Sequence, residues 1–260
     1  MPTLTVATLN LYGPPFRREE RGPLVVQQLL DVRPDIIGFQ EVDLTVDRGN
    51  WVCDRINELL RQADGHQYRI HHFSNPGRTV TQGAQAVMTH LPLLLHEGFD
   101  YLVEELPWNC VAQRVRVDLG AGIEFDFYNT HLHYQLGDEA EQIRCRQTAR
   151  LLDWMDFHGW TVPKVLVGDF NAWPDSKPVR MLKERLVSSY EHVHGCEPAK
   201  TWPTAMIRQP NAPDWTLDYI FISRDVRALD ARVVFDQPDS GDPTLFPSDH
   251  YGLTATIEVG

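Results

Sequence analysis

The chain has 260 residues, of which 42% are hydrophobic and 23% are charged, and its formal net charge at pH 7 is -12. This composition is that of a globular protein, and the length suits one large α/β domain over residues 1–260. A strongly acidic surface repels phosphate backbones, so strong non-specific binding to nucleic acid is not expected. The four cysteines are far apart and lack the spacing of zinc ligands or of a disulfide framework.

The sequence shows no apolar run long enough to span a membrane. The chain begins with a β-rich segment and shows no signal-peptide pattern, so we expect a cytoplasmic protein if this is the native amino terminus. The oligomeric state cannot be read from the sequence.

The first quarter of the chain alternates between strand and helix patterns. A β-rich segment, an amphipathic helix, a buried strand and a second amphipathic helix follow in order, over residues 3–11, 19–32, 35–40 and 52–63. Four strands joined by short turns are then expected over residues 68–73, 84–89, 111–118 and 123–129.

The second half is predicted to begin with the longest helix, over residues 138–157, and a short buried strand, over residues 164–167. A helix over residues 179–186 precedes an irregular segment, residues 191–214, that contains four prolines and Trp202. Such a segment is either a functional loop or a surface excursion anchored by tryptophans. Three strands end the chain, over residues 217–223, 226–235 and 253–259.

Polar side chains stand at the ends of several predicted strands. The most prominent group is Gly168-Asp169-Phe170-Asn171, where an acid and an amide two residues apart follow a buried strand and are expected to point the same way. Polar groups at the strand ends of an α/β sheet converge on one edge, where ligands bind. The other members are Asn10, Glu41, His131, Asp218, Asp249 and His250.

Each of these residues has an ordinary structural explanation when taken singly, such as a turn, a helix cap or a half-buried imidazole. Together they form a coherent chemical set. Glu41 and Asp249, with the amide oxygen of Asn10, give the oxygen-rich and thiolate-free ligands that Mg²⁺ or Mn²⁺ prefers.

The remaining five residues supply what phosphoester hydrolysis needs besides a metal. Asp169 is a candidate to deprotonate a water that Asn171 orients, and His131 with His250 are candidates to donate hydrogen bonds to phosphate oxygens. Asp218 is expected to orient and charge His250. The sequence contains no G-x-S-x-G motif and no glycine-rich phosphate loop, which disfavours a serine nucleophile and a P-loop.

Six short blocks resemble the endonuclease/exonuclease/phosphatase superfamily and occur in the same order. They are Thr8-Leu9-Asn10, Gly38-Phe39-Gln40-Glu41-Val42, Asn129-Thr130-His131-Leu132, Gly168-Asp169-Phe170-Asn171, Leu217-Asp218-Tyr219-Ile220-Phe221 and Ser248-Asp249-His250. The resemblance implies a four-layer α/β/β/α sandwich of two packed mixed sheets and a Mg²⁺- or Mn²⁺-dependent phosphohydrolase. It also implies that Glu41 is the principal metal ligand, and it leaves open whether Asp169 or His250 is the base.

Two features bear on the branch of the superfamily. Tyr12 stands where abasic-site endonucleases carry an acid, and the block around His131 is more similar to phosphodiesterase and deadenylase-like branches. A phosphodiesterase acting on a small molecule, lipid head group or nucleotide is therefore the leading hypothesis. The alternatives are a nuclease and, less favoured, an inactive binding module. Loops over residues 75–82, 102–110 and 191–214 are expected to shape the substrate pocket.

Overall fold

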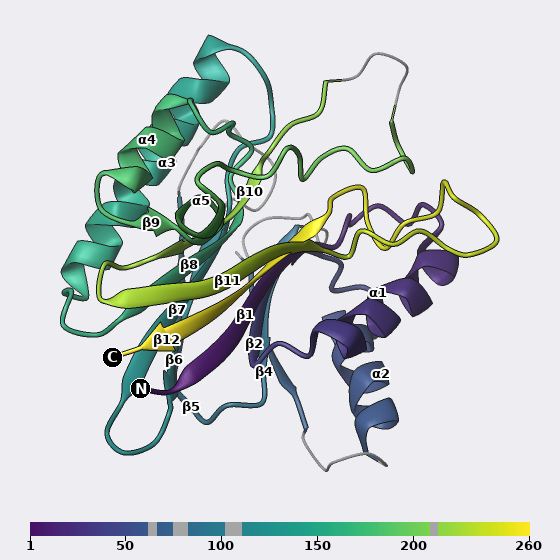
Figure 1. Cartoon of the computed structure of the whole chain (residues 1–260). Helices are drawn as coiled ribbons and strands as arrows, with labels where there is room; N and C mark the ends of the chain where they lie inside the picture. Colours follow the sequence, from purple (N-terminus) through teal and green to yellow (C-terminus); the bar gives the residue numbers. More distant parts are fainter. Residues whose placement is uncertain (62–66, 75–82, 102–110, 209–212) are drawn as a thin grey trace.

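The structure, a computed structural model, describes residues 1–61, 67–74, 83–101, 111–208 and 213–260. Two six-stranded sheets pack face to face, and helices cover the outer face of each sheet (Figure 1). The layers therefore follow the order α/β/β/α, as the sequence resemblance implied. Two of the loops expected to shape the pocket, residues 75–82 and 102–110, lie outside the described residues.

The first sheet and its covering helices are built from both ends of the chain. They comprise β1 (Thr3–Asn10), α1 (Arg18–Val32), β2 (Ile36–Val42), the short 3-10 helix η1 (Asp47–Gly49), α2 (Trp51–Leu60), β3 (Arg69–Phe73), β4 (Ala84–Thr89), β11 (Val226–Val234) and β12 (Gly252–Val259). The strand order is β11-β12-β1-β2-β4-β3. β1 is parallel to β2 and antiparallel to β12, so the sheet is mixed.

The second sheet is formed by the middle of the chain. It comprises β5 (Leu93–Asp100), β6 (Val111–Asp118), β7 (Glu124–His131), α3 (Asp138–Phe157), β8 (Lys164–Asp169), α4 (Lys177–Lys183), β9 (Val187–Ser188), α5 (Ser189–His194) and β10 (Asp218–Ile222). The order is β5-β6-β7-β8-β10-β9. β7 is parallel to β8, whereas β8 and β10 are antiparallel.

Apolar side chains fill the three spaces between the layers. Between the sheets, residues such as Val6 and Ile36 pack with Phe127 and Val167. Separate clusters join α1 and α2 to the first sheet and α3 and α4 to the second. Since every residue of β8 is buried, this strand has the apolar run expected of a sheet covered on both faces.

Sequence periodicity located most of these elements. The helix over residues 138–157 and the strands over residues 84–89 and 111–118 match the structure, and the other elements differ by one to three residues at one or both ends. The predicted irregular segment from residue 191 begins inside α5. Residues 209–212 of that segment lie outside the described residues. The same holds for residues 62–63, the predicted end of the second helix.

Two strands were missed, β5 and the two-residue β9. β5 lies at the edge of the second sheet, where Leu94 is 51% exposed, and it includes Gly98 and two charged residues. An edge strand that is buried on neither side lacks the period-two pattern that identifies a half-buried strand. The expectation of short turns between residues 89 and 111 was therefore wrong. No helix in the described part of the chain is long and apolar enough to cross a membrane.

Candidate active site

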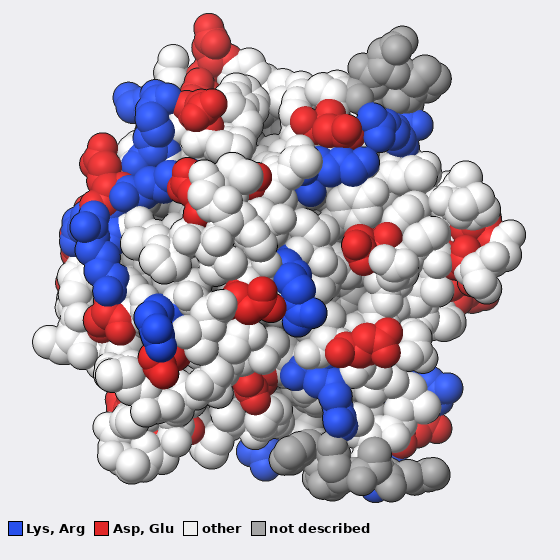
Figure 2. Space-filling view, in the orientation of Figure 1, with Lys and Arg blue, Asp and Glu red and all other residues white. Residues whose placement is uncertain are grey.

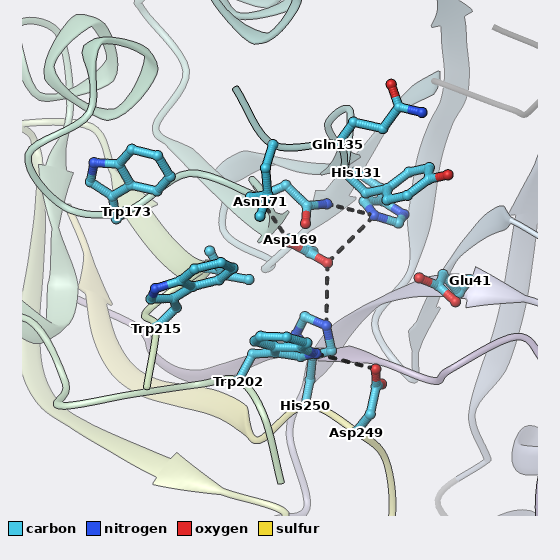
Figure 3. A pocket seen from close by; sticks show the side chains of 13 residues that line it. Glu41, His131, Gln135, Asp169, Asn171, Trp173, Trp202, Trp215, Asp249 and His250 are labelled. Carbon is cyan, nitrogen blue, oxygen red and sulfur yellow. Dashed lines mark hydrogen bonds and ion pairs between the residues drawn. The ribbon is translucent and has the colours of Figure 1, made fainter. Parts of the chain in front are cut away.

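The two sheets bring the predicted site residues together at one end of the sandwich. In the second sheet, Asp169 lies opposite His131 on β7 and opposite Asp218 on β10. In the first sheet, Asn10 ends β1 and faces Gln40 at the end of β2. Because β1, β2, β7 and β8 all present their carboxyl ends here, polar groups distant in sequence converge (Figure 3).

Asp169 is the centre of this group. Its Oδ2 accepts a hydrogen bond from the side-chain nitrogen of Asn10 at 3.0 Å and lies 3.4 Å from Nε2 of His131 and 3.6 Å from Nε2 of His250. Its Oδ1 accepts the backbone N–H of Asn171 at 2.9 Å. A carboxylate held by this many partners has a fixed orientation, which is what a group that positions and deprotonates a water requires.

His250 is held between two carboxylates. Nδ1 of its ring lies 2.8 Å from Oδ2 of Asp218, and both side chains are buried. Burial alone would lower the pKa of His250, but the charges of Asp218 and Asp169 outweigh it and raise that pKa well above its usual value. The two carboxylates thus favour the protonated imidazole, and its Nε2 is directed toward Asp169 on the cavity side.

Asn171 does not extend β8, which ends at Asp169. Its φ of 49° places it in a left-handed turn, so the expected pleat alternation does not explain its position. The turn nevertheless brings the side-chain nitrogen of Asn171 to 3.0 Å from Nε2 of His131 and 3.1 Å from the carbonyl of Leu132. Asn171 thus fixes both Asp169 and His131.

Glu41 and Asp249 form the acidic side of the site. Burial raises the pKa of Asp249 to about 6, and the nearby charge of Glu41 adds to this rise. Among the described residues, no cationic side chain forms an ion pair with either carboxylate. Two neighbouring carboxylates that no Lys or Arg pairs with among the described residues fit a hard divalent cation, which binds through one or two carboxylates, waters and substrate phosphate.

Asn10 lies between the carboxylates with its nitrogen, not its oxygen, toward them. Nδ2 donates to Glu41 Oε1 at 3.1 Å as well as to Asp169, and Oδ1 accepts the backbone N–H of Tyr12 at 2.9 Å. In this arrangement Asn10 joins the acidic side of the site to Asp169. Its role as an oxygen ligand remains a prediction.

A second set of possible ligand atoms, from Asp169, Asp218 and His250, lies within 4.8 Å of one another. The Asp218 oxygen and the His250 nitrogen in that set already hydrogen-bond to each other. A cation there would have to replace that bond and would face an imidazolium. Glu41 and Asp249 are therefore the better candidates for metal ligands.

The local backbone explains two of the motif residues. Gly168 has a φ of 148°, and a Cβ at this position would lie 2.0 Å from the carbonyl oxygen of Thr130 on the neighbouring strand. Only glycine fits there, so the residue before Asp169 is fixed by close packing of two backbones. Glu41 has a φ of 53°, at an irregularity in the pairing of β2 with β4. That strained conformation turns its carboxylate toward the site.

A cavity of about 640 Å³ opens over these groups. Six of the eight predicted site residues line it, and the other two, Asn10 and Asp218, are fully buried behind it. The remaining lining is mainly apolar or aromatic and was not predicted as a unit: Tyr134, Gln135, Leu136, Trp173, Trp202, Trp215 and Leu217. Trp202, from the irregular segment that begins at residue 191, lines the cavity, which favours the first of the two predicted alternatives, a functional loop.

Residues 7–250 match the Endonuclease/Exonuclease/phosphatase family. Nocturnin from Xenopus laevis is 26% identical over 246 residues, which cover 90% of this chain and 61% of the relative. Protein angel from Drosophila melanogaster is 26% identical over 174 residues, which cover 63% of this chain and 46% of the relative. The chain thus spans about three fifths or less of the length of these curated relatives.

Solved structures with the same fold confirm the architecture. The human Nocturnin catalytic domain superposes with a TM-score of 0.76 at 23% identity, covering 100% of this chain and 95% of the other. Truncated TDP2 from Caenorhabditis elegans superposes with a TM-score of 0.77 at 22% identity, covering 98% and 97%. Because the family match spans nearly the whole sequence and includes the strand ends that form the site, the chain belongs to the Endonuclease/Exonuclease/phosphatase family of phosphoester hydrolases.

Proposed function

We propose that the chain is a Mg²⁺- or Mn²⁺-dependent phosphodiesterase that uses an activated water. The observation that supports this most directly is the position of Asp169, which hydrogen-bonds to Asn10, lies beside His131 and His250, and shares one cavity with Glu41 and Asp249. A general base, hydrogen-bond donors and metal-binding oxygens thus surround one space.

The charges of the site residues indicate which group acts as the base and which groups donate hydrogen bonds. Asp169 accepts the proton of the attacking water, because His250 lies between the carboxylates of Asp218 and Asp169, which favour its protonated form and make it poorly suited to act as the base. His250 and His131 donate to the phosphate oxygens on which charge develops. The water oxygen bonds to phosphorus, the bond from phosphorus to one ester oxygen breaks, and the released alkoxide takes up a proton from solvent water, to which Asp169 later returns the proton that it accepted.

Glu41 and Asp249 would hold the divalent cation, which supplies charge neutralisation at the phosphate when bound. Asn10 keeps Glu41 and Asp169 at a fixed separation through hydrogen bonds to both. Among the solved relatives, the human Nocturnin catalytic domain carries a bound sulfate anion, a tetrahedral oxyanion like phosphate.

A nuclease is the second candidate. It is favoured by the structure of D. rerio TDP2 in complex with a single-strand DNA product, which has a TM-score of 0.75 at 16% identity. The charge distribution argues against it. Figure 2 shows Lys and Arg side chains interspersed with Asp and Glu on the face in view, and the net charge is -12. Strong non-specific binding of a polyanion needs a basic surface.

The test is hydrolysis of bis-p-nitrophenyl phosphate and of the monoester p-nitrophenyl phosphate, with Mg²⁺, Mn²⁺ or a chelator. We expect diester turnover that requires the metal and falls by roughly 10³-fold or more in Asp169→Asn, since that variant lacks the base. Asp175→Asn, an exposed acid on the following loop, is the matched control and keeps its rate. Full turnover in Asp169→Asn would contradict the assignment, and turnover of the monoester alone would indicate a phosphatase.

A further inference from the structure

Three tryptophans form a ladder along one wall of the active-site cavity. The indoles of Trp202 and Trp215 stack with centroids 5.4 Å apart and planes inclined by 23°. Trp173 continues the row, 6.4 Å from Trp215 and inclined by 44°. The backbones of Trp202 and Trp215 are paired in an isolated β-bridge, so the two nearer indoles have fixed positions.

The ladder begins at the reaction centre and leads away from it. The indole N–H of Trp202 points to Oδ2 of Asp249 at 3.4 Å, beside the proposed metal ligands. Trp215 and Trp173 lie on the side of Asp169 opposite to Glu41 (Figure 3). A phosphate bound between Asp169 and the acidic pair would therefore direct one of its ester groups along the indoles.

The ladder is not simply part of the core. All three indoles line the cavity, and Trp173 is 38% exposed. Tyr134 and Leu136, which are 52% and 61% exposed, line the same cavity. Large apolar side chains left exposed around a cavity of small-molecule size indicate that a ligand covers them.

The charges near the ladder limit what that ligand can carry. Among the described residues that line the cavity, none is Lys or Arg. The two cations of the neighbouring segment, Lys200 and Arg208, both form ion pairs with Asp214, at 3.4 Å and 3.1 Å. A substrate with several phosphates would therefore find no free cationic partner beyond the reaction centre among these residues.

We infer that the substrate is a small phosphodiester with one phosphate and one flat, uncharged aromatic substituent, and that this substituent packs against the row of Trp202, Trp215 and Trp173 on an indole face that the stack of Trp202 on Trp215 leaves open. This inference rests on the proposed function. A nucleobase and a simple aryl group share this chemistry, and both present a flat π face to an indole. The ladder supplies affinity through stacking where a polyanion-binding site would use charge.

The first test compares two inhibitors that differ in one six-membered ring, which is flat and aromatic in one compound and saturated and non-planar in the other. Methyl benzylphosphonate and methyl cyclohexylmethylphosphonate carry the same charge, and their carbon–phosphorus bonds resist hydrolysis. Each is titrated against metal-dependent hydrolysis of bis-p-nitrophenyl phosphate. We expect the inhibition constant of the benzyl compound to be lower by about tenfold, as aromatic stacking predicts.

The variants assign this preference to the ladder. Trp215→Leu should reduce the benzyl preference to about twofold or less, and Trp215→Phe should restore part of it. Trp173→Leu, at the exposed end of the ladder, should reduce the preference partly and provides a variant at a site that does not support the core. Phe157→Leu, an aromatic that is 84% exposed on α3, is the matched control and keeps the wild-type preference.

The second test distinguishes the source of the aromatic group. Thymidylyl-thymidine, with one phosphodiester and flat bases, is compared as an inhibitor with a single-stranded thymidine decamer. We expect the decamer to bind better by no more than about tenfold, the gain from its repeated sites, with little dependence on salt. Tight, salt-sensitive binding of the decamer would overturn the inference of a single-phosphate substrate. Weaker inhibition by the dinucleotide than by methyl benzylphosphonate would assign the ladder to a simple aryl group.

The stacking inference and the proposed function can fail separately. Metal-dependent turnover of bis-p-nitrophenyl phosphate with equal inhibition by the benzyl and cyclohexylmethyl compounds overturns the stacking inference alone. Absence of metal-dependent turnover overturns the proposed function and the inference with it. As a readout independent of turnover, methyl benzylphosphonate should quench the tryptophan fluorescence of the wild type more than that of Trp215→Leu, and equal quenching would contradict stacking on the ladder.

Discussion

The carboxylate of Asp218 lies 2.8 Å from the ring of His250, although 32 residues separate the two in sequence and both are buried. Asp218 faces one ring nitrogen, and the opposite nitrogen is directed to Asp169 at 3.6 Å. Asp218 thus fixes the ring in the orientation that points Nε2 into the cavity and supplies the charge that keeps it protonated.

Replacing Asp218 should therefore impair turnover without removing any group that lines the cavity. In Asp218→Asn we expect kcat for the diester to fall by roughly 10²- to 10³-fold, because the imidazole loses both its orientation and its counter-charge. The measurement is steady-state hydrolysis of bis-p-nitrophenyl phosphate at saturating metal. Asp230→Asn, at an exposed acid paired with Arg232, is the matched control. A loss of less than about threefold would show that His250 does not depend on Asp218.

Much of this site could be predicted because its residues stand at strand ends with distinctive neighbours. Asp169, His131 and His250 follow or precede apolar runs, and the edge of a sheet gathers such residues into one place. Their geometry also bears on the choice of the base. The sequence left the base undecided between Asp169 and His250, and the position of His250 between two carboxylates now favours Asp169.

Other parts of the site depend on contacts that no local pattern indicates. Asn129, fully buried on β7, donates to the carbonyls of Phe39 and Ala86 and accepts from Gln40 at 2.7 Å, so it joins the two sheets beneath the cavity. Asn129 stands in one of the six blocks that resemble the superfamily, but the sequence pattern predicts no role for it. The tryptophan ladder was missed as a unit because α4 and α5 separate Trp173 from Trp202 in the sequence, and the contacts of Trp215 with both depend on tertiary structure.

Gly168→Ala should destabilise the fold strongly. The added methyl group would meet the carbonyl oxygen of Thr130 at 2.0 Å, so β7 and β8 would have to separate next to Asp169. We expect the free energy of unfolding to fall by about 4 kcal/mol or more. Urea denaturation provides the measurement.

The matched control for that prediction is Gly159→Ala. Gly159 also has a positive φ, of 69°, but a Cβ there would meet nothing within 4 Å. This variant should cost only about 1 kcal/mol, from backbone strain alone. Equal losses in the two variants would show that strain at positive φ, rather than contact with Thr130, dictates glycine at position 168.

Arg21 is expected to hold the acidic side of the site in place. Its side chain is 3% exposed, and its guanidinium donates to five backbone carbonyls, those of Leu11, Tyr12, Pro14, Phe16 and Pro247. These carbonyls belong to two loops. One contains Gly13, whose N–H donates to Oε2 of Glu41 at 3.0 Å, and the other leads to Asp249.

Arg21→Lys should therefore weaken both stability and metal use. A lysine has three donors on a compact ammonium group and cannot span both loops, so we expect a loss of about 2–4 kcal/mol in the free energy of unfolding. The Mg²⁺ concentration for half-maximal turnover should rise in the folded variant. Arg224→Lys, where the arginine makes an exposed contact with one carbonyl, is the control. An unchanged Mg²⁺ requirement would mean that Arg21 stabilises the fold without positioning the ligands.

Asp126 carries an acid-sensitive part of the stability, far from the reaction centre at the opposite end of β7. It is fully buried, and both of its oxygens accept hydrogen bonds from Arg114 at 3.0 Å and from Arg116 at 2.7 and 2.9 Å. Lys164, also fully buried, lies 3.4 Å away. Burial alone would raise the pKa of Asp126, but the hydrogen bonds from Arg116 and Arg114 lower it below the usual value.

A lowered pKa in the folded state means that Asp126 stabilises the fold above the pKa of an unfolded Asp, about 3.9, and that this contribution is lost as the pH falls toward the folded value. Asp126→Asn leaves buried cations without their counter-charge, so we expect a loss of about 3–5 kcal/mol at pH 7. The difference between wild type and variant should shrink as the pH falls below about 4. Urea denaturation from pH 7 to pH 3 measures both effects, with Asp230→Asn as the exposed control. A difference that stays constant over this range would show that the variant disrupts packing and that the charge of Asp126 is not responsible.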